Sequence, residues 1–201
     1  MLKFRGISDK TSLYAAAAQH YAQQRSLIPL RGCGDRPKDP DINWKTFQYQ
    51  RPAAEQLADW FTGDLDAYGI VTGSISRLLV LDFDSADLYT IFAFMQRTLV
   101  DTYTVATRRG FHCYFTLAAN TVVQSRPGRG LDLLAEGKYV VGPGSTIDHF
   151  TYQIINDSQP RELSTADIES LFRFQADYSP TRKPQQKHQK QSQILSQTDE
   201  Q

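Results

Sequence analysis

The sequence predicts an α+β domain in which a mixed, largely antiparallel sheet is flanked by helices. Two observations support this prediction. Strand-like apolar segments are mixed with helical segments, and the second half of the chain carries a run of short strands typical of antiparallel hairpins. The 201 residues, of which 40% are hydrophobic, suffice for a single packed core.

The first third of the chain predicts two helices separated by a strand and a loop. An Ala-rich segment with apolar residues at helical spacing includes Thr11 and Ser12, either of which can cap the helix. SLIPL favours a short strand, and RGCGDRPKDPDINW is a loop by its Gly, Pro and Asp content. PAAEQLADWF favours a helix opened by Pro52, with Leu57 and Phe61 on its inner face.

The middle of the chain predicts two strands and a helix. YGIVTG and RLLVLDFD are strands joined by the turn GSIS. SADLYTIFAFMQRTL begins with the capping residue Ser85, and its apolar stripe predicts a helix. The residues of that stripe are Leu88, Ile91, Phe92 and Met95.

The remaining ordered part of the chain predicts several strands and a final helix. TYTVAT and FHCYFTL lie around the turn RRG, LDLLA and KYVVG lie around EGK, and TYQII follows. STADIESLFRF favours a helix capped by Ser164 or Thr165. We expect one domain over residues 1–177 and a disordered tail over 178–201, because the tail is rich in Gln, Lys and Ser and has little apolar content.

Bulk composition excludes several classes of protein. The 22 basic and 22 acidic residues balance, so binding to nucleic acid would require a local basic patch. Cys33 and Cys113 lie far apart without C-x-x-C spacing, which argues against a structural zinc site or a disulfide framework. The N-terminal residues lack the apolar core of a signal peptide, and no apolar run is long enough to cross a bilayer. We therefore expect a cytoplasmic protein without membrane partners.

The first candidate site is the end of the strand RLLVLDFD, where Asp82 and Asp84 are one residue apart. Side chains at i and i+2 of a strand share one face, so the two carboxylates are expected side by side. Like charges this close repel unless a cation lies between them. Because hard oxygen ligands suit Mg²⁺ and Mn²⁺, the pair predicts a divalent metal site.

Three further segments carry candidate site residues. In TRRGFHCYF, His112 and Tyr114 share a strand face, and Arg108 and Arg109 in the preceding turn are suited to bind phosphate. The alternatives are a structural histidine and a solvated turn. The loop before Trp44 adds Lys38, although its spacing excludes a P-loop.

Asp132 is a lone carboxylate inside the apolar strand LDLLA. A buried carboxylate without a partner is costly, so we expect Asp132 to share metal ions with Asp82 and Asp84. The alternative is a salt bridge to Arg126 or Arg129.

In sequence order these motifs resemble a known family. The order is a basic loop with a tryptophan, a strand–turn–strand ending in LDFD, then TRRGFHCYF, GLDL and GKYVVGPGS. It is similar to the bifunctional primase-polymerase domain of the archaeo-eukaryotic primase superfamily, a type common on plasmids, phages and mobile elements. The resemblance covers roughly Leu13 to Ile155 and implies a primase-polymerase catalytic core with an RRM-like palm.

The resemblance also implies roles for the candidate residues. Asp82, Asp84 and Asp132 match the carboxylates that hold two catalytic Mg²⁺ or Mn²⁺ ions, and His112 matches a histidine that contacts the incoming triphosphate. Two metal ions would stabilise the attacking and leaving oxygens during nucleotidyl transfer. We expect the nucleotide-binding set to be completed by Arg108, Arg109, Lys38 and Ser145, the last of which matches the closing P-x-S of the family pattern.

The implied function is template-directed nucleotidyl transfer on single-stranded DNA with NTP or dNTP substrates, in mobile-element replication or in repair. A separate helicase or replication partner is expected, because the chain has no P-loop. One departure is that Arg108 and Arg109 replace a small Ser-Gly pair of the family.

Two alternatives remain open from the sequence. LDFDSAD also fits the first motif of a haloacid-dehalogenase-type Mg-dependent phosphatase, with Asp82 as the phosphorylated nucleophile. That enzyme would need a later acidic pair, which the chain after Asp132 does not offer at a strand end. The other alternative is a non-catalytic domain that binds nucleotides or single strands through the two arginines.

Overall fold

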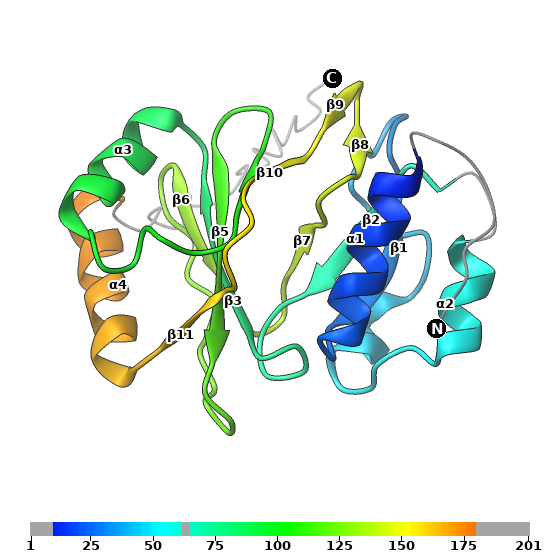
Figure 1. Ribbon diagram of the computed structural model, residues 1–201, viewed down its shortest axis with the longest axis horizontal. Helices are drawn as coiled ribbons and strands as arrows, with labels where there is room; N and C mark the ends of the chain where they lie inside the picture. The colour runs from blue at the N-terminus through cyan, green and yellow to red at the C-terminus, as the bar shows by residue number, and fades with distance from the viewer. Residues whose placement is uncertain (1–9, 62–64, 180–201) are drawn as a thin grey trace, which may run out of the picture.

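The computed structural model describes residues 10–61 and 65–179, so most of the predicted C-terminal tail lies outside the described residues. The fold is α+β, as predicted, with largely antiparallel sheets and helices on their outer faces. Figure 1 shows the layers in order: two helices, a six-stranded sheet, a three-stranded sheet, and two further helices. The two sheets therefore face each other in the middle of the molecule.

The three-stranded sheet has the order β1-β2-β7, and both of its pairings are antiparallel. Its edge strand β1 contains Pro29, which lacks a backbone N–H. The strand is buried along its whole length. The elements of this part are α1 (Lys10–Ala22), β1 (Ser26–Leu30), the 3₁₀ helix η1 (Trp44–Gln48), α2 (Ala54–Phe61), β2 (Ala67–Val71) and β7 (Tyr139–Val141).

The six-stranded sheet has the order β10-β4-β5-β3-β6, with β11 added beside the C-terminal part of β5. Every pairing is antiparallel except the parallel one between β11 and β5. Helices α3 and α4 cover its outer face (Figure 1). Its elements are β3 (Leu78–Phe83), α3 (Ala86–Met95), β4 (Thr104–Ala106), β5 (Phe111–Leu117), β6 (Leu131–Leu134), β10 (Gln153–Asn156), β11 (Arg161–Leu163) and α4 (Thr165–Tyr178).

A separate two-stranded hairpin, β8 (Thr146–Ile147) and β9 (Phe150–Thr151), links β7 to β10. Its two turn residues, Asp148 and His149, both have positive φ values, of 47° and 69°. A two-residue turn with this backbone matches the twist of an antiparallel pair.

The alternation of side chains along β3 and β5 produces two hydrophobic cores, one on each face of the six-stranded sheet. Val80 of β3 and Tyr114 of β5 contribute to the core between the two sheets. Leu81 and Cys113, their neighbours in sequence, contribute to the core beneath α3 and α4. Since residues of one parity point to one face, this arrangement fixes which polar residues of β3 and β5 face the space between the sheets.

Several details differ from the sequence-based predictions. Helix α1 begins at Lys10, so Thr11 and Ser12 lie within the helix instead of capping it. The turn GSIS joins β2 to β3 as predicted, and Gly73 and Leu78 form an antiparallel bridge across it, but the two strands belong to different sheets, as do β6 and β7. In the predicted stripe of α3 Phe92 is buried, whereas Ile91 and Met95 are exposed.

Candidate active site

Asp82 lies opposite two other candidate residues in the six-stranded sheet. Strand β3 lies between β5 and β6, and the register pairs Asp82 with His112 on one side and with Asp132 on the other. Residues directly opposite each other in antiparallel strands point to the same face, with Cβ atoms about 4.5–5.5 Å apart. The backbone therefore brings these three residues, which are far apart in sequence, to one place on the inner face of the sheet.

The side chains of Asp82 and His112 interact directly. His112 Nε2 lies 3.3 Å from Asp82 Oδ1, and the histidine is 5% exposed. Burial alone would raise the pKa of Asp82. The nearby His112, Lys38 and Arg109 outweigh burial and hold that pKa below its ordinary value, so Asp82 is ionised at neutral pH. The other ring nitrogen of His112, Nδ1, is buried and has no hydrogen-bond partner in the part of the chain that the structure describes.

Asp84 lies just beyond β3 and pairs with the turn between β4 and β5. Its Oδ1 is 2.7 Å from an Nη of Arg109, and both side chains are exposed. Gly110 permits this approach, because a Cβ at that position would lie 2.0 Å from the carbonyl oxygen of Phe83. The charge of Arg109 also acts on Asp82, so the two carboxylates of LDFD share one guanidinium neighbour.

Asp132 has a backbone partner: its Oδ1 accepts a hydrogen bond of 2.8 Å from the amide of Gly128. The alternative predicted from sequence, an ion pair with a neighbouring arginine, is not seen among the described residues, and Arg126 lies over the ring of Phe172 instead. Within residues 10–61 and 65–179, no three acidic, His or Cys side chains stand close enough together to enclose a metal ion. Asp82 and Asp132 are nevertheless adjacent by register.

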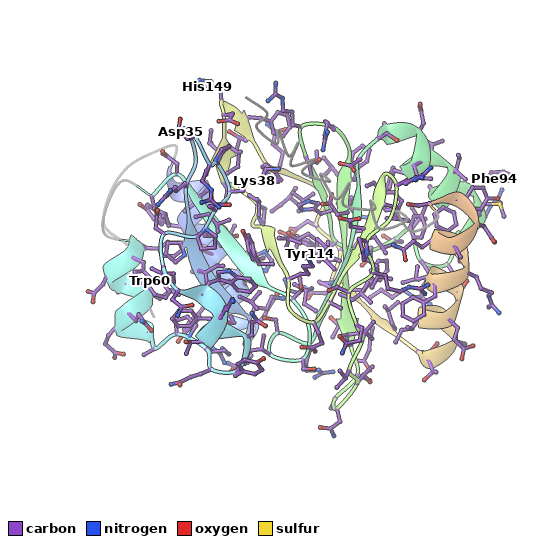
Figure 2. The ribbon with its side chains drawn as sticks, turned by 180° about the vertical axis from the view of Figure 1, so that it is seen from behind. Asp35, Lys38, Trp60, Phe94, Tyr114 and His149 are labelled. Atoms are coloured by element: carbon purple, nitrogen blue, oxygen red, sulfur yellow. The ribbon has the colours of Figure 1, made fainter. Side chains whose placement is uncertain are left out.

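Two adjoining cavities lie beside these residues. One, of about 370 Å³, is lined by Asp82 and His112, and the other, of about 390 Å³, is lined by Arg108 and Arg109. Lys38 lines both, so the cavities form one cleft, with Asp82 and His112 in one part and the two arginines in the other. Figure 2 shows Lys38 in the loop beyond β1, nearer the edge of the molecule than the central Tyr114.

The loop that carries Lys38 is fixed by its own hydrogen bonds. The Lys38 amide donates to the Arg31 carbonyl, and the Arg31 amide donates to the Asp39 carbonyl. The hydroxyl of Tyr139 on β7 donates to the Lys38 carbonyl at 3.2 Å. Lys38 has a φ of 74°, an unfavourable value for a side-chain-bearing residue, and such strain is common at functional sites.

The sequence profile of the Prim-Pol family, described as bifunctional DNA primase/polymerase, N-terminal, matches residues 17–166. This chain belongs to the Prim-Pol family. A comparison with curated proteins gives no significant match. Membership supports a DNA primase/polymerase-type function for this Prim-Pol chain, with DNA and nucleotides as substrates. The match includes the strand that carries Asp82 and Asp84, so it favours this function over the phosphatase considered from sequence.

Tyr152 is a residue of the Prim-Pol cleft that the sequence did not single out. It is buried, it lines both cavities, its ring centroid lies 5.7 Å from that of His112, and the Lys38 ammonium lies 6.0 Å from it. In the sequence it reads as one more apolar position of the strand TYQII. Only the fold places it between the histidine and the lysine.

Ser145 is the one expected nucleotide-binding residue that the Prim-Pol structure does not bring to the cleft. It is fully buried, and its hydroxyl oxygen accepts a 3.1 Å hydrogen bond from the amide of Tyr68. The contact joins the segment after β7 to β2, which indicates a role in packing. Across the residues that the structure describes, none of the helices has the length and apolar character needed to span a membrane.

Proposed function

We propose that this domain catalyses template-directed nucleotidyl transfer on single-stranded DNA, with Asp82, Asp84 and Asp132 holding two Mg²⁺ or Mn²⁺ ions. The observation that carries the proposal is the register of β3, which sets Asp82 opposite both His112 and Asp132, with Asp82 and His112 lining a cleft that continues to Arg108 and Arg109. A reaction between an acidic metal site and a triphosphate requires these two kinds of group side by side.

The donor set fits the proposed ions. All three side chains offer carboxylate oxygens, which Mg²⁺ and Mn²⁺ prefer, and the depressed pKa of Asp82 keeps it in the form that binds metal. In this structure Asp84 forms an ion pair with Arg109, and Asp132 accepts a hydrogen bond from the Gly128 amide. The exposed pair with Arg109 is a weak interaction, so Asp84 can exchange it for a stronger cationic partner. When bound, the metal ions would stabilise charge on the attacking and leaving oxygens.

The remaining residues of the cleft would position the nucleotide. Arg108, Arg109 and Lys38 line the basic cavity, where they can neutralise the phosphates of an incoming NTP or dNTP. His112 Nε2 lies 3.3 Å from Asp82 Oδ1, and it would donate to a phosphate oxygen once Asp82 is engaged as a metal ligand. Positioning and electrostatic stabilisation of this kind supply most of the catalysis in phosphoryl transfer. We also propose that the domain works with a separate unwinding partner, in replication of a mobile element or in repair.

An incorporation assay tests the proposal. The full-length protein is incubated with single-stranded DNA, labelled nucleotides and Mn²⁺ or Mg²⁺, with and without a primer. We expect labelled product from the wild type, loss of product by at least about 100-fold in Asp82→Ala and in Asp84→Ala, and no product after chelation of the metal ions. Asp87→Asn, which changes an exposed acid in the first turn of α3, is the matched control.

Circular dichroism checks that the variants remain folded. Wild-type-like incorporation by a folded Asp82→Ala protein would refute the metal assignment. Release of phosphate from small phosphoesters without incorporation would favour the phosphatase. Binding of nucleotide or single strands without incorporation under any condition would favour the non-catalytic domain.

A further inference from the structure

A cavity of about 450 Å³ lies apart from the cleft, at the opposite end of the same strands. Thr116 lines this cavity and His112 lines the cleft, and the two are four residues apart on β5, or roughly 13 Å at 3.3 Å per residue. The lining comes from the end of α1, the turn between β2 and β3, and the segment before β11. It consists of Gln23, Gln24, Arg25, Ser74, Ile75, Ser76, Arg77, Thr116, Gln159 and Pro160.

Arg25 is the unusual member of this lining. It is 4% exposed, and none of the ion pairs among the described residues includes it. Among the described residues, the hydrogen bond of its side chain is to His20, where an Nη lies 2.5 Å from Nδ1. Because a guanidinium can only donate, His20 must accept through Nδ1 and is therefore neutral. The arginine thus carries a buried positive charge without a compensating negative one.

The surroundings of Arg25 offer aromatic faces and spare hydrogen-bonding groups. Its guanidinium carbon lies 6.0 Å from the ring centroid of Tyr114, and burial lowers the pKa of Arg25. The buried hydroxyls of Tyr68 and Tyr103 and the Nε2 atom of His20, in the same cluster, have no hydrogen-bond partner within residues 10–61 and 65–179. A buried charge that is not paired is costly, so this cluster requires a compensating group from outside the described residues.

Apart from Ile75 and Pro160, the rest of the lining is polar, and it carries net positive charge. Arg77 is half-exposed, its Nε donates to the Leu117 carbonyl at 2.8 Å, and it makes a long contact of 3.4 Å with Glu162. The lining contains two arginines and no carboxylate, and the side-chain amides of Gln23 and Gln159 add donors. Such a set suits an oxyanion with several acceptor oxygens.

We propose that the cavity lined by Arg25 and Arg77 is a second phosphate-binding site, separate from the nucleotide cleft. Its ligand is a phosphate group, carried either by the backbone of a bound DNA strand or by a free nucleotide. The bound phosphate supplies the negative charge that Arg25 lacks and accepts from the arginine and glutamine donors around it. The site involves no bond making, and it does not depend on the proposed catalytic activity.

The first test is a titration of the wild-type, full-length protein with sodium phosphate against sodium chloride at equal ionic strength. Amide chemical shifts by NMR report the location, and the melting temperature reports binding. We expect phosphate to shift the amides of residues 23–25 and 74–77 and to raise the melting temperature. Absence of shifts in these two segments, or shifts confined to residues 108–112 of the cleft, would overturn the proposal.

Variants separate this site from the cleft. In Lys38→Ala/Arg108→Ala the phosphate-induced shifts of residues 23–25 and 74–77 should persist. In Arg77→Gln, which changes a half-exposed side chain, and in Arg25→Gln the dissociation constant for phosphate should rise about tenfold. Arg97→Gln, an exposed arginine on the far side of the molecule, is the control and should leave it unchanged. Wild-type affinity in folded Arg77→Gln and Arg25→Gln proteins would contradict the site.

Two further ligands identify the source of the phosphate. If the site holds a DNA backbone, an oligodeoxythymidylate shifts residues 23–25 and 74–77 at lower concentration than a nucleoside triphosphate does. If it holds a free nucleotide, the order is reversed. In both cases the amide chemical shifts of residues 23–25 and 74–77 change. If neither ligand changes these shifts, the result would count against the proposal.

Discussion

At the scale of single residues, the candidate active site depends on one position in one strand. Asp82 has a neighbour on each side because β3 lies between two antiparallel strands, and those neighbours are a histidine and a second aspartate. A shift of β3 by one residue would turn Asp82 toward the core beneath α3 and α4 and away from its two neighbours. The apolar residues that alternate with them, such as Leu81 and Leu133, therefore hold the site in place.

His112→Ala should weaken nucleotide use more than template binding. The side chain lies in the cleft beside Asp82 and is directed at the phosphates in our proposal. We expect the apparent KM for nucleotide to rise about tenfold, while the dissociation constant for single-stranded DNA changes less than twofold. Steady-state incorporation kinetics and fluorescence anisotropy measure the two quantities.

His112→Gln serves as the conservative control, because an amide can still donate a hydrogen bond, and it should restore part of the KM effect. A change confined to DNA affinity would show that the histidine contacts the template.

Ser145→Ala should reduce stability without affecting nucleotide binding. The hydroxyl is buried and bonds to the amide of Tyr68, so its removal leaves a buried donor without a partner. We expect the free energy of unfolding to fall by about 1–2 kcal/mol, with the KM for nucleotide unchanged. Urea denaturation measures the free energy of unfolding.

The control is Ser158→Ala, which removes a hydroxyl bonded to the exposed Asp101 and should change the free energy of unfolding by less than about 0.5 kcal/mol. A raised KM for nucleotide in Ser145→Ala would show that Ser145 takes part in nucleotide binding.

At the scale of elements, the helix α4 has a well-defined start. Ser164 accepts a hydrogen bond from the Asp167 amide, and the Asp167 carboxylate accepts from the Ser164 amide in return. The Ser164 hydroxyl donates to that carboxylate as well, and the two bonds that the carboxylate accepts lower the pKa of Asp167. The carboxylate therefore stabilises the folded state above its unfolded pKa of about 3.9 and loses that effect as the pH falls through the lowered pKa. The cap fixes the helix against the outer face of the six-stranded sheet.

Ser164→Ala should therefore destabilise the protein in a pH-dependent way. The free energy of unfolding should fall by about 1 kcal/mol at pH 7, and the difference from the wild type should become smaller as the pH falls below about 4 and through the lowered pKa of Asp167. Urea denaturation at neutral and at acidic pH measures this. An equal difference at the two pH values would show that the hydrogen bond from the Ser164 hydroxyl to the Asp167 carboxylate contributes nothing.

The elements that could be predicted from sequence are those with a strong local signal. Ser85 and Ser164 both cap helices as expected, and the strands around the RRG turn pair as expected, because caps and short turns are local. The assignment of β2 and β3 to different sheets could not be predicted from their turn, since it depends on partners from distant parts of the chain. The parallel strand β11 was missed for the same reason.

The candidate active site likewise contains residues that could be predicted from the sequence and residues that could not. A period of two along β5 was enough to predict that His112 shares a face with Tyr114, but that this face and Asp82 lie toward the space between the sheets depends on the fold. Tyr152 carries no such signal, because an aromatic residue in a strand is ordinarily a core residue. Exposure of Ile91 and Met95 on α3 likewise depends on how the helix is rotated against the sheet, which helical spacing alone does not determine.

At the scale of the whole molecule, the chain passes between the two main sheets between β2 and β3, between β6 and β7, and again on the way from β7 to β10. Neither sheet is built from one continuous segment. The two sheets also share a core, to which Val71 and Val80 contribute from opposite sides. We expect a single calorimetric unfolding transition, with equal calorimetric and van't Hoff enthalpies, whereas two resolved transitions would show that the sheets unfold independently.

The proline in β1 has a consequence for how copies of the molecule meet. An open sheet edge is a template for strands of neighbouring molecules, which is one route to fibrils. Pro29 removes one of the donors that an added strand would use, and the isolated bridge between Leu30 and Pro40 occupies part of the same border. The small sheet is thereby protected from edge-to-edge aggregation at high concentration.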